Sequence, residues 1–229
     1  MTEIKKRTQN DRQADTHLVD ALVSLPPKIL IACEYSGTMR DAFARLGFNS
    51  WSCDLLGTEK PGKHIQGDVL EIINDGWDMM IAHPPCTYLA NSGVGWLYKK
   101  PGRWEQMRQG AEFFKKLLNA DIPLIAIENP IPHKYALEII GRKYDQLIQP
   151  YQFGHLESKA TCLWLKGLPG LKETNNVKEE MLKLNKNEWQ RLHYLPPSKE
   201  RWKLRSKTFD GIAKAAAEQW MPILARRSN

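Results

Sequence analysis

Short apolar runs alternate with amphipathic stretches along most of the chain. The apolar runs predict buried strands at residues 28–32, 49–53, 64–69, 77–82 and 122–127. Between them, apolar residues at helical spacing predict helices at residues 38–46, 69–74, 103–119 and 134–140. Strands that alternate with helices in this way predict an α/β fold with a mostly parallel sheet.

The pattern changes after residue 140. Residues 144–152 and 159–165 alternate apolar and polar positions, which predicts two antiparallel strands. A last helix is expected to begin near Thr208, where small and apolar residues recur at helical spacing. We expect residues 91–101 to form a mobile loop, because they are rich in Gly, Asn, Ser and Lys.

This pattern predicts one folded domain at residues 27–221, with residues 166–207 as a small basic insertion. A polar arm with one short helix at 17–25 is expected at residues 1–26, and a tail at 222–229. The 229 residues suffice for one domain with a core. The four cysteines show no CxxC pairing, so neither a metal site nor a disulfide framework is predicted.

The charge and the termini narrow the class of protein. A formal net charge of +7 and a pI near 9.2 suit a polyanionic partner, although many basic proteins bind no nucleic acid. No apolar run approaches the length of a membrane span, so no membrane partner is expected. The polar first twenty residues do not resemble a signal peptide, and we expect a cytoplasmic protein.

A turn after the first strand is the first candidate binding element. Glu34, Tyr35, Ser36 and Gly37 lie between a predicted strand and a predicted helix, which is how α/β nucleotide-binding units begin. Asp54 ends the second strand, where such units place an acid that accepts hydrogen bonds from ribose hydroxyls. An ordinary loop aspartate is the alternative for Asp54.

Asp68 also has two interpretations. It stands near the third strand, where such folds place an acid close to the exocyclic amine of adenine. It also directly precedes a predicted helix, and aspartate is a preferred N-cap residue. The two roles are compatible, and both stay open.

Two further strand ends carry candidate chemistry. Pro84 and Pro85 follow the fourth strand and end its hydrogen-bond ladder, so Cys86 is fixed at the mouth of a loop. A fixed thiol is a candidate nucleophile, although a small buried apolar role is equally open. Glu128 and Asn129 end the fifth strand and would be natural partners of that thiol.

These two motifs, Pro84-Pro85-Cys86 and then Glu128-Asn129, resemble the DNA cytosine-5 methyltransferases. The matching segments run in the family's order over about residues 28–221, although Met39 stands where the family has the second glycine of its first turn. The resemblance implies a Rossmann-like fold that uses S-adenosylmethionine, with a mostly parallel sheet and an antiparallel edge pair. It identifies the cofactor-binding residues as Glu34, Tyr35, Ser36, Gly37, Asp54, Asp68 and Pro84.

The resemblance also implies catalytic roles. Cys86 as thiolate would add to C6 of cytosine, and Glu128 would protonate or hydrogen-bond N3. Asn129 would orient the glutamate or bind the sugar edge, and Pro85 would contact the pyrimidine. For that role we expect burial to raise the pKa of Glu128.

Two departures from the family affect the expected substrate. Residues 166–207 replace a large target-recognition segment, and no Arg-x-Arg supports the base, so Lys159 is the nearest candidate cation. Arg103 and Arg108 are further candidates for substrate contact, with a solvated helix face as the alternative. The chain therefore looks like a minimal member of a phage or prophage type, active in a bacterial or phage-infected cell.

DNA is the expected partner, and single-stranded or weakly specific binding is the easier form to accommodate. One alternative is C5 modification of a free pyrimidine nucleotide by the same fold. Another is a catalytically silent nucleotide- or DNA-binding protein.

Overall fold

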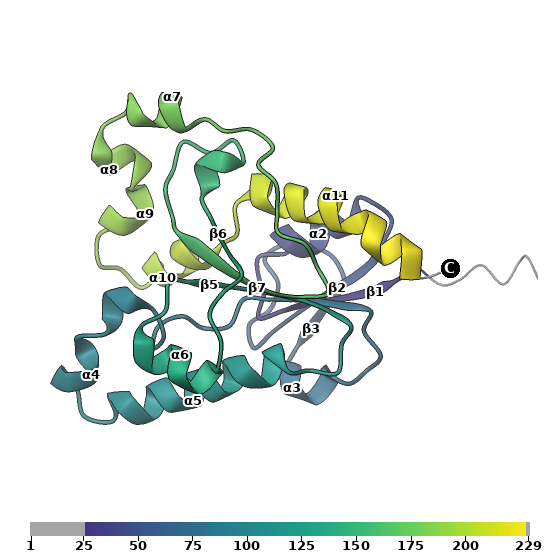
Figure 1. Ribbon diagram of the computed structural model, residues 1–229, viewed down its shortest axis with the longest axis horizontal. Helices are drawn as coiled ribbons and strands as arrows, with labels where there is room; N and C mark the ends of the chain where they lie inside the picture. The colour runs from purple at the N-terminus through teal and green to yellow at the C-terminus, as the bar shows by residue number, and fades with distance from the viewer. Residues whose placement is uncertain (1–25, 228–229) are drawn as a thin grey trace, which may run out of the picture.

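A seven-stranded sheet runs through the centre of the computed structural model, which describes residues 26–227 (Figure 1). The strand order is β3-β2-β1-β4-β5-β7-β6. Strand β7 is antiparallel to both neighbours, and all other neighbouring pairs are parallel. The expected fold class is confirmed: an α/β, Rossmann-like fold with a mostly parallel sheet and an antiparallel pair at one edge.

The strands lie at the predicted positions, although β3 and β6 are shorter than the strands expected at 64–69 and 144–152. They are β1 (Lys28–Ala32), β2 (Asn49–Asp54), β3 (His64–Gln66), β4 (Met79–Ala82), β5 (Leu124–Pro130), β6 (Gln146–Ile148) and β7 (Thr161–Lys166). Strands β1 and β4 lie in the middle of the sheet and are covered on both faces, which is why they read as continuous apolar runs without alternation.

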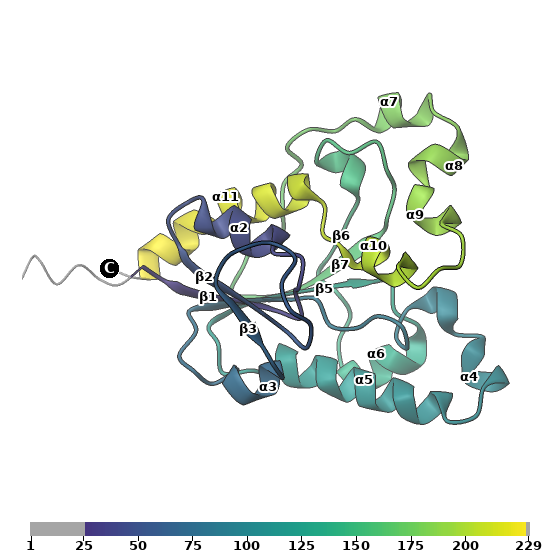
Figure 2. The same ribbon diagram turned by 180° about the vertical axis from the view of Figure 1, so that it is seen from behind.

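Two helical layers cover the sheet (Figures 1 and 2). Helices α2 (Thr38–Ala44) and α11 (Asp210–Arg227) pack against one face, and Phe43 and Trp220 are buried there. Helices α3 (Val69–Ile72), α5 (Arg103–Leu118) and α6 (Lys134–Ile140) cover the other, where Phe114 packs on Trp164. The amphipathic stretches of the sequence correspond to these layers.

Three segments differ from the sequence-based expectation. Residues 91–101, expected to be a loop, contain the short helices η1 (Asn91–Gly93) and α4 (Trp96–Lys99). Residues 150–152, expected to end the strand at 144–152, form the 3₁₀ turn η2 (Pro150–Gln152). Residues 166–207, for which no helix was expected, contain α7 (Lys178–Leu182), α8 (Lys186–Trp189), α9 (Arg191–Tyr194) and α10 (Arg201–Ser206). Single helical turns are too short to leave a readable apolar period, so the sequence pattern missed them.

The expected tail at 222–229 is also corrected. Helix α11 continues through Pro222 to Arg227, and Leu224 is buried in the core. Packing of that side chain offsets the backbone hydrogen bond that a proline inside a helix removes.

The expected N-terminal arm and its short helix lie almost entirely outside the described residues, apart from residue 26. Within residues 26–227, no helix combines the length and the apolar character that crossing a membrane requires.

Candidate active site

The candidate residues gather at the carboxyl ends of the parallel strands. Strands β1, β4 and β5 are neighbours in parallel register, so their carboxyl ends open at one edge of the sheet. Helices α4 and α10 flank that end of the molecule in both views (Figures 1 and 2). In open α/β sheets this edge is where ligands bind.

A buried hydrogen bond joins the two strand-end motifs. The Asn129 side-chain amide donates to the Pro84 carbonyl oxygen at 2.8 Å. Asn129 is buried, whereas Pro85 is exposed and Cys86 is partly exposed. The bond therefore fixes the loop that carries Cys86 to the strand that carries Glu128.

Three side chains surround the Glu128 carboxylate. His83 Nδ1 lies 3.0 Å from Oε2, and the Thr208 hydroxyl donates to the same oxygen at 3.4 Å. Lys159 Nζ lies 4.0 Å from Oε1. These groups come from the Cys86 loop, the segment before α11 and the segment before β7, so three parts of the chain meet at one carboxylate.

The expectation of a raised Glu128 pKa was wrong. Burial alone raises the pKa, but the hydrogen bond and charge of His83, with the charge of Lys159, outweigh it and lower the pKa to about 2. Burial lowers the pKa of His83, but the Glu128 carboxylate more than compensates and the net shift is upward. The two residues form an ion pair, which the sequence analysis missed because it assigned no role to His83.

Cys86 lies in the same electrostatic environment. Burial raises the pKa of its thiol, the charges of Lys159 and Arg205 lower it, and the Glu128 carboxylate raises it. The net shift is upward, so the thiol is protonated at rest. A base that removes the proton, or further positive charge close to the sulfur, is needed to form the thiolate.

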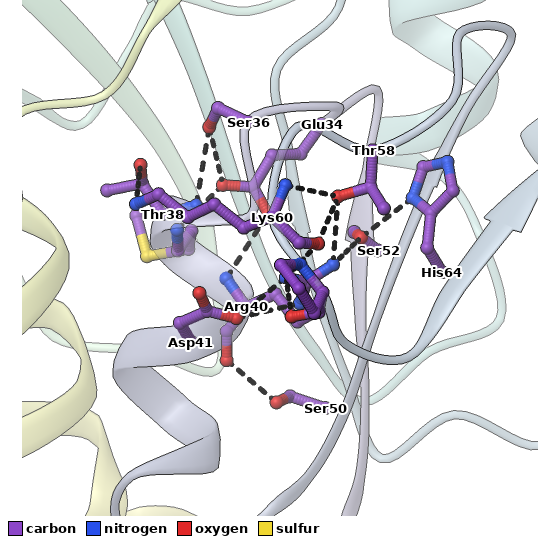
Figure 3. Close-up of polar contacts among 12 residues, drawn as sticks. Glu34, Ser36, Thr38, Arg40, Asp41, Ser50, Ser52, Thr58, Lys60 and His64 are labelled. Atoms are coloured by element: carbon purple, nitrogen blue, oxygen red, sulfur yellow. Dashed lines mark hydrogen bonds and ion pairs between the residues drawn. The ribbon is translucent and has the colours of Figure 1, made fainter.

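The turn after β1 is organised by a buried carboxylate (Figure 3). Glu34 is 4% exposed and accepts hydrogen bonds from the backbone amides of Met39 at 2.6 Å and Arg40 at 3.2 Å. The Ser36 hydroxyl also donates to it, at 3.2 Å. Glu34 thus caps the first turn of α2, where dinucleotide-binding folds instead place a pyrophosphate.

Arg40 fastens this turn to the following loop (Figure 3). Its guanidinium is fully buried and donates five hydrogen bonds, to the side chains of Asp41, Ser52 and Thr58 and to the carbonyls of Lys60 and Pro61. A Cβ at Gly37 would lie 2.5 Å from Arg40 Nη2. Gly37 therefore leaves room for the guanidinium, and its φ of 72° also suits glycine.

The remaining predicted cofactor residues lie around this turn. The Tyr35 hydroxyl donates to the Lys203 carbonyl at 3.0 Å and lies 3.1 Å from the Ser206 hydroxyl. Asp54 accepts from the Leu56 amide at 2.9 Å, and burial raises its pKa. Asp68 caps α3 by accepting from the Leu70 amide at 2.9 Å, so its expected N-cap role is confirmed.

A small cavity of about 40 Å³ lies between this turn and the segment before α11. It is lined by Cys33, Glu34, Tyr35, Ser36, His83, Ser206, Lys207 and Thr208. That volume holds a few water molecules. The cavity is therefore smaller than a nucleoside.

The three candidate substrate cations differ in position. Lys159 is at the site, because it pairs with Glu128. Arg103 donates to the Thr87 carbonyl at 2.7 Å and lies over the Tyr88 ring, so it supports the loop that carries Cys86. Arg108 pairs with Glu105 on the exposed face of α5, as its alternative interpretation expected.

Comparison with known proteins adds little to this geometry. No protein-family model and no curated protein sequence matches the chain. Among solved structures, the chain is similar to a provisionally assigned DNA modification methyltransferase encoded within a prophage of E. coli, with a TM-score of 0.40 and 16% identity. The match covers 71% of this chain and 49% of the other, so the chain spans about half the length of that structure. A similarity this low says nothing about the reaction.

Proposed function

We propose that the protein transfers a methyl group from S-adenosylmethionine to C5 of cytosine in DNA, through a covalent bond between Cys86 and the base. The observation that carries the proposal is the Asn129–Pro84 hydrogen bond. It fixes a thiol and a carboxylate at neighbouring strand ends, with Lys159 acting electrostatically on both.

The turn after β1 favours a cofactor without phosphate groups. The first amides of α2 already donate to the Glu34 carboxylate, so an entering pyrophosphate would meet a buried negative charge. S-adenosylmethionine carries an amino group and a sulfonium, which suit an acidic surrounding. Asp54 would hold the ribose, Asp68 would lie near the adenine, and Glu34 to Gly37 would contact the amino-acid part. Bound there, the cofactor supplies an electrophilic methyl group.

The residues of the chain would divide the remaining work. Cys86 forms a bond to C6 of the ring, and Glu128 stabilises the charge that develops at N3. Asn129 and Pro84 hold the cysteine loop in place. Loss of the C5 proton and release of the Cys86 thiolate complete the turnover.

Positive charge around Cys86 favours a DNA strand over a free nucleotide. Lys159 and Arg205 act on the thiol directly, and Arg103 anchors the adjoining loop. Lys99 and Lys100 lie over the exposed Trp96 ring on α4, and an exposed aromatic beside cations is typical of single-strand contacts. A free nucleotide would need only one of these cations.

The test is transfer of a labelled methyl group to cytosine-containing oligonucleotides, with free cytidine nucleotides in parallel. We expect labelled oligonucleotide from wild-type protein and none from Cys86→Ala, and a covalent adduct with an oligonucleotide that contains 5-fluorocytosine. Cys162→Ala, which removes a buried thiol from β7, is the matched control and is expected to remain active. Activity in Cys86→Ala would rule out this mechanism, and label in free nucleotides alone would favour the other substrate.

A further inference from the structure

His83 is the closest charged neighbour of the candidate acid. It directly precedes the two prolines, and its side chain is 11% exposed against 14% for Glu128. The 3.0 Å contact joins Nδ1 to Oε2, so a proton can pass between the two groups without any change in the backbone.

The second ring nitrogen of His83 differs from the first in its pairing. His83 Nε2 is buried and has no hydrogen-bond partner among the described residues. His83 also lines the small cavity with Glu34 and Thr208. An unpaired buried nitrogen is costly, so its presence in a residue that lines a cavity indicates a place for an exchangeable hydrogen-bond partner.

The other charged groups around His83 mostly favour its cation. Glu128 and Glu34 stabilise the imidazolium, and Asp54 also lies within reach of its charge. Lys159 opposes it. Thr208 contacts Glu128 but carries no charge, and Lys159 Nζ lies further from the carboxylate than Nδ1 does.

We propose that His83 holds the proton that Glu128 delivers to N3 of the substrate ring. The proposal rests on the proposed function and adds a residue that acts through Glu128. His83 is thus a positioning residue for the acid and its proton reservoir.

The proton that N3 takes up and returns is supplied within the site. The Cys86 thiol first loses its proton to water. The thiolate then forms a bond to C6, and the electron pair of the ring double bond moves to N3. N3 takes a proton from Glu128, and Glu128 takes one from Nδ1, which leaves a neutral imidazole beside a carboxylate. After C5 has taken the methyl group, the C5 proton passes to water, its electron pair re-forms the C5–C6 double bond and the Cys86 thiolate is expelled. N3 then returns its proton through Glu128 to His83, and the ion pair is restored.

The test is the pH profile of covalent trapping, measured with the full-length protein, S-adenosylmethionine and a 5-fluorocytosine oligonucleotide. Wild-type protein should show two ionisations, one from the Cys86 thiol and one from the His83–Glu128 pair. In His83→Gln the amide still donates to Glu128 but holds no mobile proton. We expect the ionisation of the pair to move to lower pH by about one unit or more, and trapping at pH 8 to fall by about tenfold or more.

His133→Gln is the matched control. His133 is also buried, but it caps α6 by accepting from the Ala136 amide. The His133→Gln variant should lower stability but leave the ionisations of the Cys86 thiol and of the His83–Glu128 pair in place. A His83→Gln profile that matches wild type overturns the role of His83 while the proposed function stands, whereas wild-type protein that neither traps nor methylates DNA overturns the proposed function.

A second readout does not depend on activity. Nitrogen chemical shifts of histidine-labelled protein should show His83 as imidazolium at pH 7 in wild type and as neutral imidazole in Glu128→Gln. A neutral His83 in wild-type protein at pH 7 would contradict the proposal directly.

Discussion

Two buried charged clusters lie near the same end of the sheet, and they differ in how fully their polar atoms are paired. All five N–H groups of the Arg40 guanidinium donate to acceptors in the chain. In the cluster around Glu128, His83 Nε2 and the Asn129 side-chain oxygen are buried without a hydrogen-bond partner among the described residues.

The difference separates a charged group that stabilises the fold from charged groups that are available to a ligand. A fully paired cation holds the surrounding backbone in place, because any movement of that backbone breaks several hydrogen bonds at once. A partly paired cluster keeps donors and acceptors for a ligand, at a cost in stability. Removing a member of the first cluster should therefore mainly reduce stability, and removing a member of the second should mainly alter ionisation and reaction.

The largest stability loss is expected for Arg40→Met. The variant leaves the acceptors of the loop at residues 58–61 without their buried donor, and we expect the free energy of unfolding to fall by about 3–5 kcal/mol. Urea denaturation measures it. Arg45→Met is the control, because Arg45 ends the same helix and is exposed. Equal stability of the two variants would show that the Arg40 cluster is not structural.

Gly37→Ala tests the same cluster from the other side. The alanine Cβ would lie 2.5 Å from the Arg40 guanidinium, and the backbone at position 37 has a φ of 72°. We therefore expect the free energy of unfolding to fall by about 3 kcal/mol. Gly47→Ala shares a positive φ of 86° but has no atom within 4 Å, and about 1 kcal/mol is expected there. Similar losses in the two variants would mean that backbone strain alone makes glycine necessary at position 37.

The ion pair of the second cluster predicts a pH-dependent stability. Glu128 has a pKa of about 2, below its ordinary 4.5, so its contribution is present above pH 4.5 and is lost as the pH falls towards 2. The pKa of His83 is raised, so its contribution to stability is fully present below its ordinary pKa of 6.5. That contribution is lost as the pH rises through the pKa of the folded state. Between pH 4.5 and 6.5, the free energy of unfolding of wild-type protein should exceed that of Glu128→Gln by the largest amount, about 2 kcal/mol.

Urea denaturation across pH 3–9 gives that profile. Glu105→Gln is the control, because Glu105 forms an exposed pair with Arg108 and should show almost no effect. A stability difference for Glu128→Gln that stays constant with pH would contradict the ion pair.

The smallest effect is expected for Tyr35→Phe, which removes the hydroxyl that meets Lys203 and Ser206. A loss of about 1 kcal/mol is expected, together with faster tryptic cleavage after Arg205 and Lys207, because this bond helps to hold the 203–208 segment over the cavity. Tyr194→Phe, at an exposed position, is the control. Unchanged cleavage in Tyr35→Phe would show that other contacts hold the segment.

The sequence by itself determined the elements that have strong periodicity. Buried central strands read as continuous apolar runs, and the long helices show a clear stripe, so β1, β4, β5, α5 and α6 could be predicted closely. The strand ends followed from the strands, which is why Cys86, Glu128 and Asn129 could be named as neighbours. Single-turn helices between residues 91 and 206 left no such signal.

Only the tertiary structure decided the state of the site. The partners of Glu128 come from positions 83, 159 and 208, and no local pattern in the chain connects them. Burial of Glu128 predicts a raised pKa, and the contact with His83 reverses its direction. A pKa depends on the sum of burial and nearby charge in space, and a sequence gives the identity of the groups without the distances between them.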